Sequence, residues 1–268
     1  MGYENWIGKT ETCQDLITRW PLTALAATLD REGPGEIVPP LWHWLYFLPV
    51  HRQSELGRDG HGRRGEFLPP VELPRRMWAG GRFEFFDALR VGDEPERTST
   101  ILSVQEKQGR SGALVFVVVR HEVRTERGLA LSEEHDIVYR EHAAGDAPVQ
   151  EAPPDFEWER VVHPDDVLLF RYSALTFNGH RIHYDRRYCT GVEHYPGLVV
   201  HGPLVATMLL GLVPEAVTKF SFRAVSPLFD TEAFHVRGRR EGNGASLYAG
   251  TAAGRLAMMA SAEFAARR

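Results

Sequence analysis

Two halves of this chain repeat the same order of segments, and this repetition limits the fold more than any other feature. Each half has an apolar run with a proline near its start, residues 37–48 and residues 198–210. Continuous apolar composition after a proline is typical of a buried helix. Strand-like runs rich in β-branched and aromatic residues follow each apolar run. The order predicts, twice, a long central helix wrapped by an antiparallel sheet.

The remaining segments complete this prediction. Further helical segments, residues 15–30 and 166–176, precede the two apolar runs. The expected strands are residues 82–86, 97–104, 113–123 and 129–139 in the first half, and 218–224, 232–239, 246–252 and 257–264 in the second. The dipeptide Asn243-Gly244 favours a two-residue hairpin. We therefore expect the α+β class and a tandem duplication, not a solenoid of short repeats.

A segment rich in proline, alanine and acidic residues separates the halves. Residues 141–157 show neither helical nor strand periodicity, which is typical of a linker. With 268 residues the chain is long enough for two domains. We expect an N-terminal domain at residues 1–140 and a C-terminal domain at residues 158–268. Residues 52–70, rich in glycine and arginine, read as a solvent-exposed insertion, with a cover over a site as the alternative.

Composition excludes several classes of protein. The formal net charge is −5 and no block of lysine and arginine dominates, so we expect no nucleic-acid partner. The longest apolar run has about half the length that spans a bilayer, so we expect no membrane insertion. Only Cys13 and Cys189 occur, too few for a disulfide framework. Together with an N-terminus unlike a signal peptide, this favours the cytoplasm.

The segment from Arg171 to Asp185 carries the chemistry. It places Asn178, His180 and His183 within six residues, and a later His201-Gly202-Pro203 opens the second apolar run. An imidazole exchanges protons at neutral pH. The first N–H groups of a helix have no intrahelical partner and stabilise negative charge on a carbonyl oxygen. The combination indicates proton transfer on a carbonyl compound, with the N–H of Gly202 as oxyanion donor.

A metal site is an alternative reading of the histidines. His180, His183, His194 and His201 are close in sequence, but no nearby cysteine or glutamate completes a zinc pattern. The glycine-rich stretches match neither a phosphate loop nor a dinucleotide fingerprint. We therefore expect no metal and no other cofactor.

The stretch from Tyr172 to Asp185 resembles the catalytic loop of the MaoC-like hydratases and dehydratases of acyl thioesters. It is most similar to the type 2 hydroxyacyl-thioester dehydratases and to itaconyl-CoA or mesaconyl-C4-CoA hydratases. The typical family loop, Ser-Gly-Asp-x-Asn-Pro-Ile-His, aligns with Thr176 to His183 without a gap. The closing His183 matches, and two departures bear on the chemistry, because Asn178 stands where the catalytic aspartate usually is and His180 where an asparagine usually is. Residues 77–82 and 107–117 are similar to the N-terminal domains of the same proteins.

This resemblance implies a double hot-dog fold whose C-terminal half holds the catalytic residues and whose N-terminal half helps to form the acyl pocket. It implies that His183 is the base and that Asn178 orients water. Assisting roles are open for three more residues, His180, Asp185 and Tyr172. Asp185 more simply caps the following turn. Arg181 and His201 are the candidate substrate-binding residues.

The expected function is reversible hydration of a 2-enoyl-CoA thioester, with itaconyl-CoA or mesaconyl-C4-CoA giving citramalyl-CoA. Four arginines could meet the extra carboxylate of such a substrate: Arg75, Arg82, Arg181 and Arg223. A (3R)-hydroxyacyl-thioester dehydratase of straight chains is the alternative. Asn178 in the aspartate position keeps a non-catalytic acyl-CoA-binding protein open, and a hot-dog thioesterase is a further alternative. Two chains could associate as a homodimer.

Overall fold

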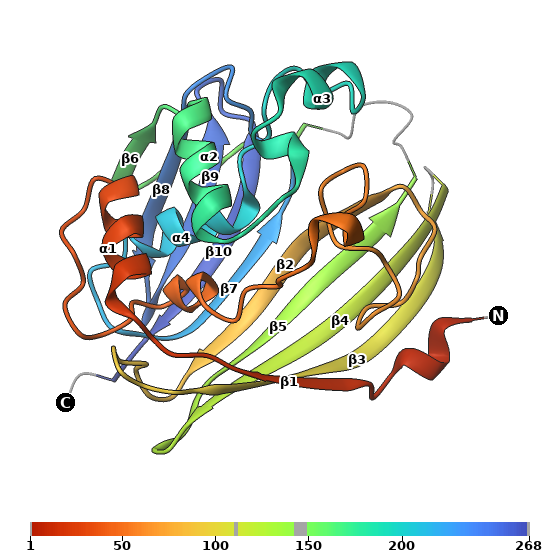
Figure 1. Ribbon diagram of the computed structural model, residues 1–268. Helices are drawn as coiled ribbons and strands as arrows, with labels where there is room; N and C mark the ends of the chain where they lie inside the picture. The colour runs from red at the N-terminus through yellow and green to blue at the C-terminus, as the bar shows by residue number, and fades with distance from the viewer. Residues whose placement is uncertain (1, 110–111, 142–148, 267–268) are drawn as a thin grey trace.

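The computed structural model describes residues 2–109, 112–141 and 149–266. The strands of the first half are β1 (Thr10–Gln14), β2 (Arg75–Phe85), β3 (Glu96–Gly109), β4 (Gly112–Thr125) and β5 (Gly128–Arg140). Those of the second half are β6 (Trp158–Val162), β7 (Val217–Ala224), β8 (Phe234–Glu241), β9 (Gly244–Thr251) and β10 (Leu256–Phe264). Together they form one antiparallel sheet in the order β1-β3-β4-β5-β2-β7-β10-β9-β8-β6 (Figure 1).

The duplication is visible in this strand order. Read outward from the centre, the first half runs β2-β5-β4-β3-β1 and the second half runs β7-β10-β9-β8-β6. The two series match strand for strand. They meet where β2 pairs with β7, from Gly80 opposite Arg223 to Glu84 opposite Lys219. We call this pairing the seam. The expected α+β class is confirmed. Residues 142–148 of the expected linker lie outside the described residues.

Four α-helices lie among the described residues: α1 (Arg19–Thr28), α2 (Asp166–Leu175), α3 (Arg186–Gly191) and α4 (Gly202–Leu210). Short 3-10 helices are η1 (Tyr3–Trp6), η2 (Trp42–Leu45), η3 (Gln53–Glu55) and η4 (Arg181–His183). In α4 every residue from Leu204 to Leu210 is buried, as its apolar composition predicts. It packs against β7, β8, β9 and β10, so it is the central helix of the second half (Figure 1).

The first half does not contain the long central helix expected at residues 37–48. The segment forms only the turn η2, although Trp42, His43 and Leu45 are buried. Leu41 and Phe47, which flank it, have φ angles of 70° and 54°. This left-handed backbone cannot continue an α-helix, and Pro39-Pro40 disfavours helical geometry before it. The prediction of two long central helices was therefore wrong: one half has such a helix, and it has 9 residues.

The expected strands are all present, and several are longer than their patterns predict. β2 begins at Arg75 and β3 extends to Gly109. The two outermost strands, β1 and β6, were not expected. At the seam the inward-facing Phe83 packs against Phe220 and Phe222, with ring centroids 5.8 and 6.0 Å away. This contact joins the two halves through their core.

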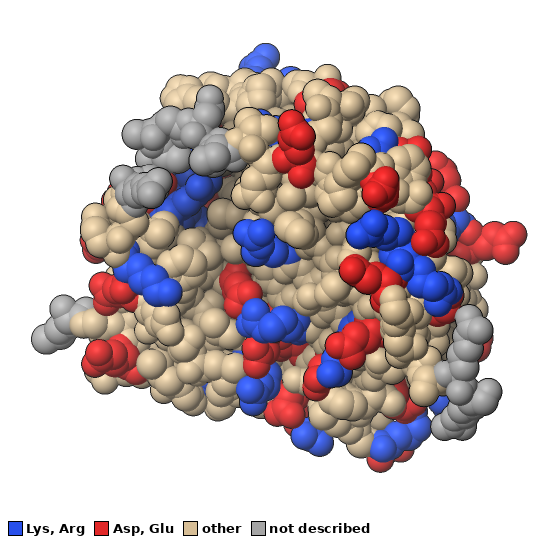
Figure 2. Space-filling view, turned by 180° about the vertical axis from the view of Figure 1, so that it is seen from behind, with Lys and Arg blue, Asp and Glu red and all other residues tan. Residues whose placement is uncertain are grey.

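The outer face of the sheet near the seam is charged. Arg82 donates hydrogen bonds to Glu134 and Asp136, and Arg223 lies against Met259 on the same face. A hollow of about 540 Å³ lies there, and Arg82 is the one residue considered for the site that lines it. Positive and negative side chains are interspersed on the face of the molecule that Figure 2 shows. No helix in the described part of the chain has the length and apolar character needed to cross a membrane.

Candidate active site

The loop that contains the motif is held between two capped helices. Asp165 accepts the N–H of Leu168 and caps α2. The helix ends before Phe177, whose φ of 48° is left-handed. Asp185 then accepts the N–H of Tyr188 at 3.0 Å and caps α3. Residues 176–184, between the end of α2 and the cap of α3, carry the motif expected to be catalytic, and we call them the catalytic loop.

His183 is fixed in the tautomer that a base requires. The side chain is buried, and its Nδ1 lies 2.7 Å from the carbonyl oxygen of Val199. Because a carbonyl can only accept, Nδ1 carries the proton and Nε2 keeps a lone pair. Burial lowers the pKa of His183 to about 4, although the hydrogen bond to Val199 opposes this shift. The imidazole is therefore neutral at neutral pH, with one nitrogen free to accept a proton.

The start of α4 lies beside this ring. His201, the N-cap residue, stacks on His183 with ring centroids 3.8 Å apart and planes 18° apart. Its Nε2 lies 2.8 Å from Ser173 Oγ, and the buried ring of Tyr172 packs against it edge-on at 5.0 Å. Gly202 is the first residue of α4. Its N–H belongs to the helix end that has no intrahelical acceptors.

Asn178 and His180 are linked by the backbone of the loop. The Oδ1 atom of Asn178 accepts the N–H of His180 at 3.0 Å, which closes an Asx turn. The ring of His180 stands edge-on to that of His183, with centroids 5.4 Å apart. The structure thus brings the ring of His180 next to His183, and the side-chain oxygen of Asn178 already has a donor.

The other candidate residues have structural partners. Asp185 accepts from the Arg181 guanidinium at 2.7 Å in addition to capping α3. Arg181 also lies over the ring of Tyr188 at 4.2 Å. Arg75 donates to the carbonyl of Glu193. The suggestion that four arginines meet a substrate carboxylate was wrong for Arg82, which faces the outer side of the sheet with its own acidic partners.

A loop of the first half, residues 57–62, lies against the catalytic loop. The N–H of Arg181 donates to the carbonyl of Asp59 at 2.9 Å, and its guanidinium donates to the carbonyl of Arg58 at 3.0 Å. Gly60 has a φ of 89°, and a Cβ built on it would lie 1.8 Å from the carbonyl oxygen of Gly179. Only glycine fits there. The segment expected as an exposed insertion is therefore part of the site.

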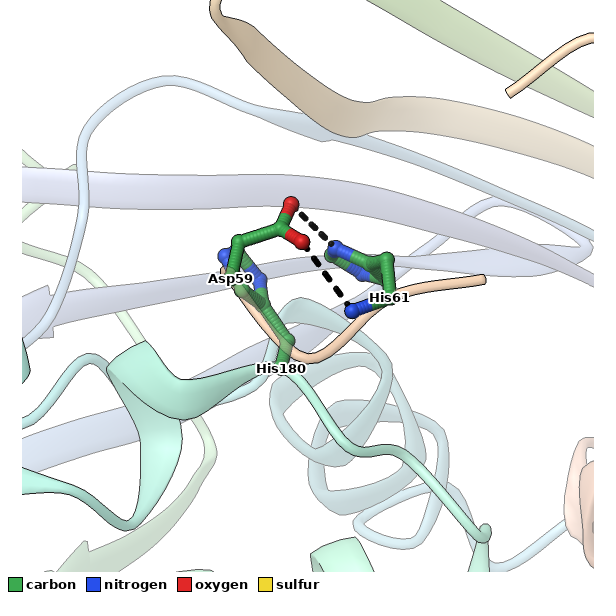
Figure 3. Close-up of side chains that lie close together, drawn as sticks. All are labelled: Asp59, His61 and His180. Atoms are coloured by element: carbon green, nitrogen blue, oxygen red, sulfur yellow. Dashed lines mark hydrogen bonds and ion pairs between the residues drawn. The ribbon is translucent and has the colours of Figure 1, made fainter. Parts of the chain in front are cut away.

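This loop brings two side chains that the sequence reasoning missed. His61 Nδ1 lies 3.1 Å from the Oδ2 of Asp59. The ring of His61 is 4.1 Å from that of His180, centroid to centroid (Figure 3). The signal in the sequence was an Asp-Gly-His triplet inside a glycine-rich loop, because loops over a rigid scaffold often carry functional side chains.

Burial controls the charge of this histidine array, which consists of His61, His180, His183 and His201. It lowers the pKa of His61, although the hydrogen bond that His61 donates to Asp59 opposes this shift. It also lowers the pKa of His180 and of His201, and the neighbouring imidazoles add to both shifts. Burial alone would raise the pKa of Asp59, but its hydrogen bonds with His61 lower the pKa below its usual value. The site therefore contains neutral imidazoles and one carboxylate.

Among the residues that the structure describes, two groups of side chains have ligand atoms close enough to hold a metal ion. Asp59, His61 and His180 offer ligand atoms within 4.8 Å of one another, and so do His121, Glu133 and His135. In the first group, Asp59 and His61 already satisfy each other through a hydrogen bond.

Comparisons with known proteins place the chain in a family. Residues 41–230 match the model of hydroxyacyl-thioester dehydratase type 2. A mesaconyl-C4-CoA hydratase of Chloroflexus aurantiacus is 45% identical, over 96% of this chain and 96% of that protein. The mitochondrial hydroxyacyl-thioester dehydratase type 2 of Schizosaccharomyces pombe is 26% identical, over 86% of this chain and 90% of that protein.

Solved structures show the same fold. A MaoC-like dehydratase superposes with a TM-score of 0.71 at 14% identity, covering 97% of this chain and 98% of its own. The HtdX protein of Mycobacterium tuberculosis gives a TM-score of 0.69 at 16% identity, covering 96% of this chain and 100% of its own. The fold is the double hot-dog expected from the resemblance. The chain belongs to the hydroxyacyl-thioester dehydratase type 2 family.

Proposed function

We propose that this protein reversibly hydrates a 2-enoyl-CoA thioester and that mesaconyl-C4-CoA is its substrate, giving citramalyl-CoA. The observation that carries the reaction class is His183, a buried neutral imidazole with a free Nε2 beside the N-terminus of α4. The similarity to the Chloroflexus aurantiacus hydratase supports the choice of substrate. Itaconyl-CoA is the isomeric candidate.

In the hydration direction, Nε2 of His183 takes a proton from water while the water oxygen bonds to the β-carbon. The electron pair of the double bond moves toward the α-carbon and the thioester carbonyl, whose oxygen gains negative charge. That oxygen accepts the N–H of Gly202. The α-carbon then takes the proton from the His183 imidazolium, which restores the neutral base. The sum is addition of one water, with no net change in the protein.

Two terms account for much of the acceleration that the protein supplies. A positioned general base contributes about a hundredfold to ten-thousandfold. One oxyanion donor at a helix N-terminus lowers the barrier by roughly 3 kcal/mol. Both terms depend on the stacked pair of His183 and His201, because the N-cap residue of α4 is the one that packs on the base.

We further propose that each half of the chain is a hot-dog domain, residues 1–140 and 158–268, joined by residues 141–157. The repeated strand order on the two sides of the seam supports this division. The catalytic loop and α4 come from the second domain, and residues 57–62 come from the first.

A second candidate is dehydration of (3R)-hydroxyacyl thioesters with straight chains, which the relative from Schizosaccharomyces pombe favours. The same base and oxyanion donor would serve it, since dehydration is the reverse of the steps above. The two candidates differ in the acyl group that the protein accepts.

The test is to follow the enoyl absorbance of mesaconyl-C4-CoA, itaconyl-CoA and crotonyl-CoA with the purified protein. We expect the highest kcat/KM with mesaconyl-C4-CoA. Turnover restricted to crotonyl-CoA would reject the proposed substrate and favour the second candidate. Release of free CoA thiol would identify a thioesterase instead. Binding without turnover of any of the three would favour a non-catalytic acyl-CoA-binding protein.

A further inference from the structure

A water molecule that attacks the β-carbon must be held as well as deprotonated. It has two O–H groups, and only one of them can donate to Nε2 of His183. In the family loop a carboxylate occupies the position of Asn178. Here one lone pair of the Asn178 Oδ1 accepts the N–H of His180 at 3.0 Å, and the NH2 group of the amide only donates. Asn178 therefore offers the water at most one lone pair, fewer than a carboxylate would, and a second acceptor nearby would compensate for this loss.

His61 has the properties of that acceptor. A carboxylate only accepts, so the contact of Asp59 Oδ2 with His61 Nδ1 at 3.1 Å places the proton on Nδ1. Nε2 of His61 then keeps a lone pair, as Nε2 of His183 does. Because burial lowers the pKa of His61, this lone pair is available at neutral pH.

The position of His61 in the array also fits. Its ring lies 4.1 Å from that of His180, and His180 lies 5.4 Å from His183, in each case between centroids. His61 is also close enough to His183 for a positive charge on His61 to lower the pKa of His183. Figure 3 shows Asp59 and His61 on the loop of the first half, facing His180 on the catalytic loop.

Backbone contacts hold this loop in a fixed position against the catalytic loop. Asp59 is held through its own carbonyl by the N–H of Arg181. The next residue, Gly60, touches Gly179 so closely that no side chain fits. The two loops therefore position one another, and the carboxylate of Asp59 is anchored two residues before the imidazole that it orients.

We propose that His61 is a catalytic residue contributed by the first half, and that Asp59 is its positioning residue. Nε2 of His61 accepts the second hydrogen bond of the attacking water, the task that a carboxylate at position 178 would perform. No proton moves to His61: the water proton goes to His183 and then to the α-carbon. This inference rests on the proposed hydration.

The test compares the wild-type protein with His61→Ala, Asp59→Asn and His183→Ala on mesaconyl-C4-CoA. For His61→Ala we expect kcat to fall about a hundredfold with KM nearly unchanged, and added imidazole to restore part of kcat. For Asp59→Asn we expect a fall of about tenfold or more, because an amide can present its NH2 to the ring and favour the wrong tautomer. His183→Ala should abolish turnover.

His51→Ala is the matched control. His51 lies on the same segment, packs on Gly62 and faces Glu66 at 3.7 Å, outside the Asp59 and His61 pair. It should keep wild-type kcat. Circular dichroism and Tm verify that each variant is folded.

Three outcomes would reject the role of His61 without rejecting the proposed hydration. In these cases the wild-type protein still turns over substrate, and His183→Ala still abolishes that turnover. The three outcomes are full activity of His61→Ala, a loss in folded His61→Ala that imidazole does not restore, and an equal loss in His51→Ala. If the wild-type protein turns over none of the enoyl-CoA substrates, the proposed hydration fails, and the role of His61 fails with it.

Discussion

The described part of the chain contains two groups of clustered histidines, and they differ in what lies between the rings. In the histidine array of the active site, His183 and His201 stack directly on each other. In the first half, a second group surrounds a buried carboxylate, Glu133. Its Oε2 accepts from His43 Nε2 and from Trp44 Nε1, each at 3.0 Å, and its Oε1 lies 3.1 Å from His135 Nε2.

This difference separates groups that can react from groups that hold the fold. Burial alone would raise the pKa of Glu133, but the nearby His135 and His43 outweigh it and lower the pKa well below the usual value. In the Glu133 group, two donors thus bond to Oε2 and His135 lies within ion-pair distance of Oε1. The active-site array leaves ring nitrogens for a substrate or water. Both groups consist mainly of histidines, so the hydrogen-bond partners of each ring determine what that group can do.

The largest expected effect is on the turnover rate, and it should follow a change in the histidine array. Replacing His183 with glutamine should lower kcat/KM about a thousandfold, or roughly 4 kcal/mol of barrier, because the amide cannot take a proton from water. Enoyl absorbance with mesaconyl-C4-CoA measures this. His163→Gln, at an exposed position, is the control and should behave as wild type. Equal rates for both variants would mean that the array is not catalytic.

The corresponding change in the Glu133 group should act on stability. Glu133→Ala removes the acceptor of two buried hydrogen bonds and the carboxylate beside His135, and we expect a loss of roughly 3 to 5 kcal/mol in the free energy of unfolding. Urea unfolding measures it. Glu122→Ala removes an exposed carboxylate paired with Arg124 at 3.3 Å, and should cost less than about 1 kcal/mol. Similar urea midpoints for Glu133→Ala and Glu122→Ala would mean that the Glu133 group does not stabilise the fold.

The lowered pKa of His183 should make the stability of the protein depend on pH. His183 has a pKa of about 4 in the folded protein and of about 6.5 when unfolded. As pH falls from 6.5 toward 4, the unfolded chain binds a proton that the folded chain does not, so stability falls. The contribution of this residue is about 3 kcal/mol. Urea unfolding at pH 7 and pH 4.5 should therefore show a smaller loss for His183→Gln than for wild type. Equal losses would contradict the lowered pKa.

The smallest expected effect tests a residue at the edge of the active site. Asp185 caps α3 and pairs with Arg181, so Asp185→Ala should cost about 1 kcal/mol of stability. Turnover should change less than about tenfold, because the carboxylate acts through the loop and not on the substrate. Thermal unfolding and kcat report the two effects. A thousandfold loss of kcat in a stable variant would move Asp185 into the catalytic group.

The sequence predicted the parts of the molecule that depend on local pattern. Alternating and apolar runs identified the meanders and α4, and the motif from Tyr172 to Asp185 identified the catalytic loop. Residues 37–48 show the limit of such patterns. Apolar composition predicts burial, and the segment is buried, but the left-handed geometry of Leu41 and Phe47 is set by packing that no local pattern contains.

The site was predictable only in the part that one segment supplies. His183, His201 and Gly202 come from the second half and lie together as expected. Asp59 and His61 reach it from a loop more than a hundred residues earlier in the chain. Their glycine-rich surroundings are typical of exposed loops, and the contact of Gly60 with Gly179, which explains the glycine at position 60, depends on the tertiary structure.

The seam has a consequence for the exposed edges of the sheet. Among the described residues, the first half has only the buried turn η2 where the second half has α4, yet its strand β2 covers the inner edge of β7. Without β2, strand β7 would present an open row of N–H and C=O groups beside Phe220 and Phe222, and such edges promote aggregation. The inner strand of each half therefore protects the inner edge of the other.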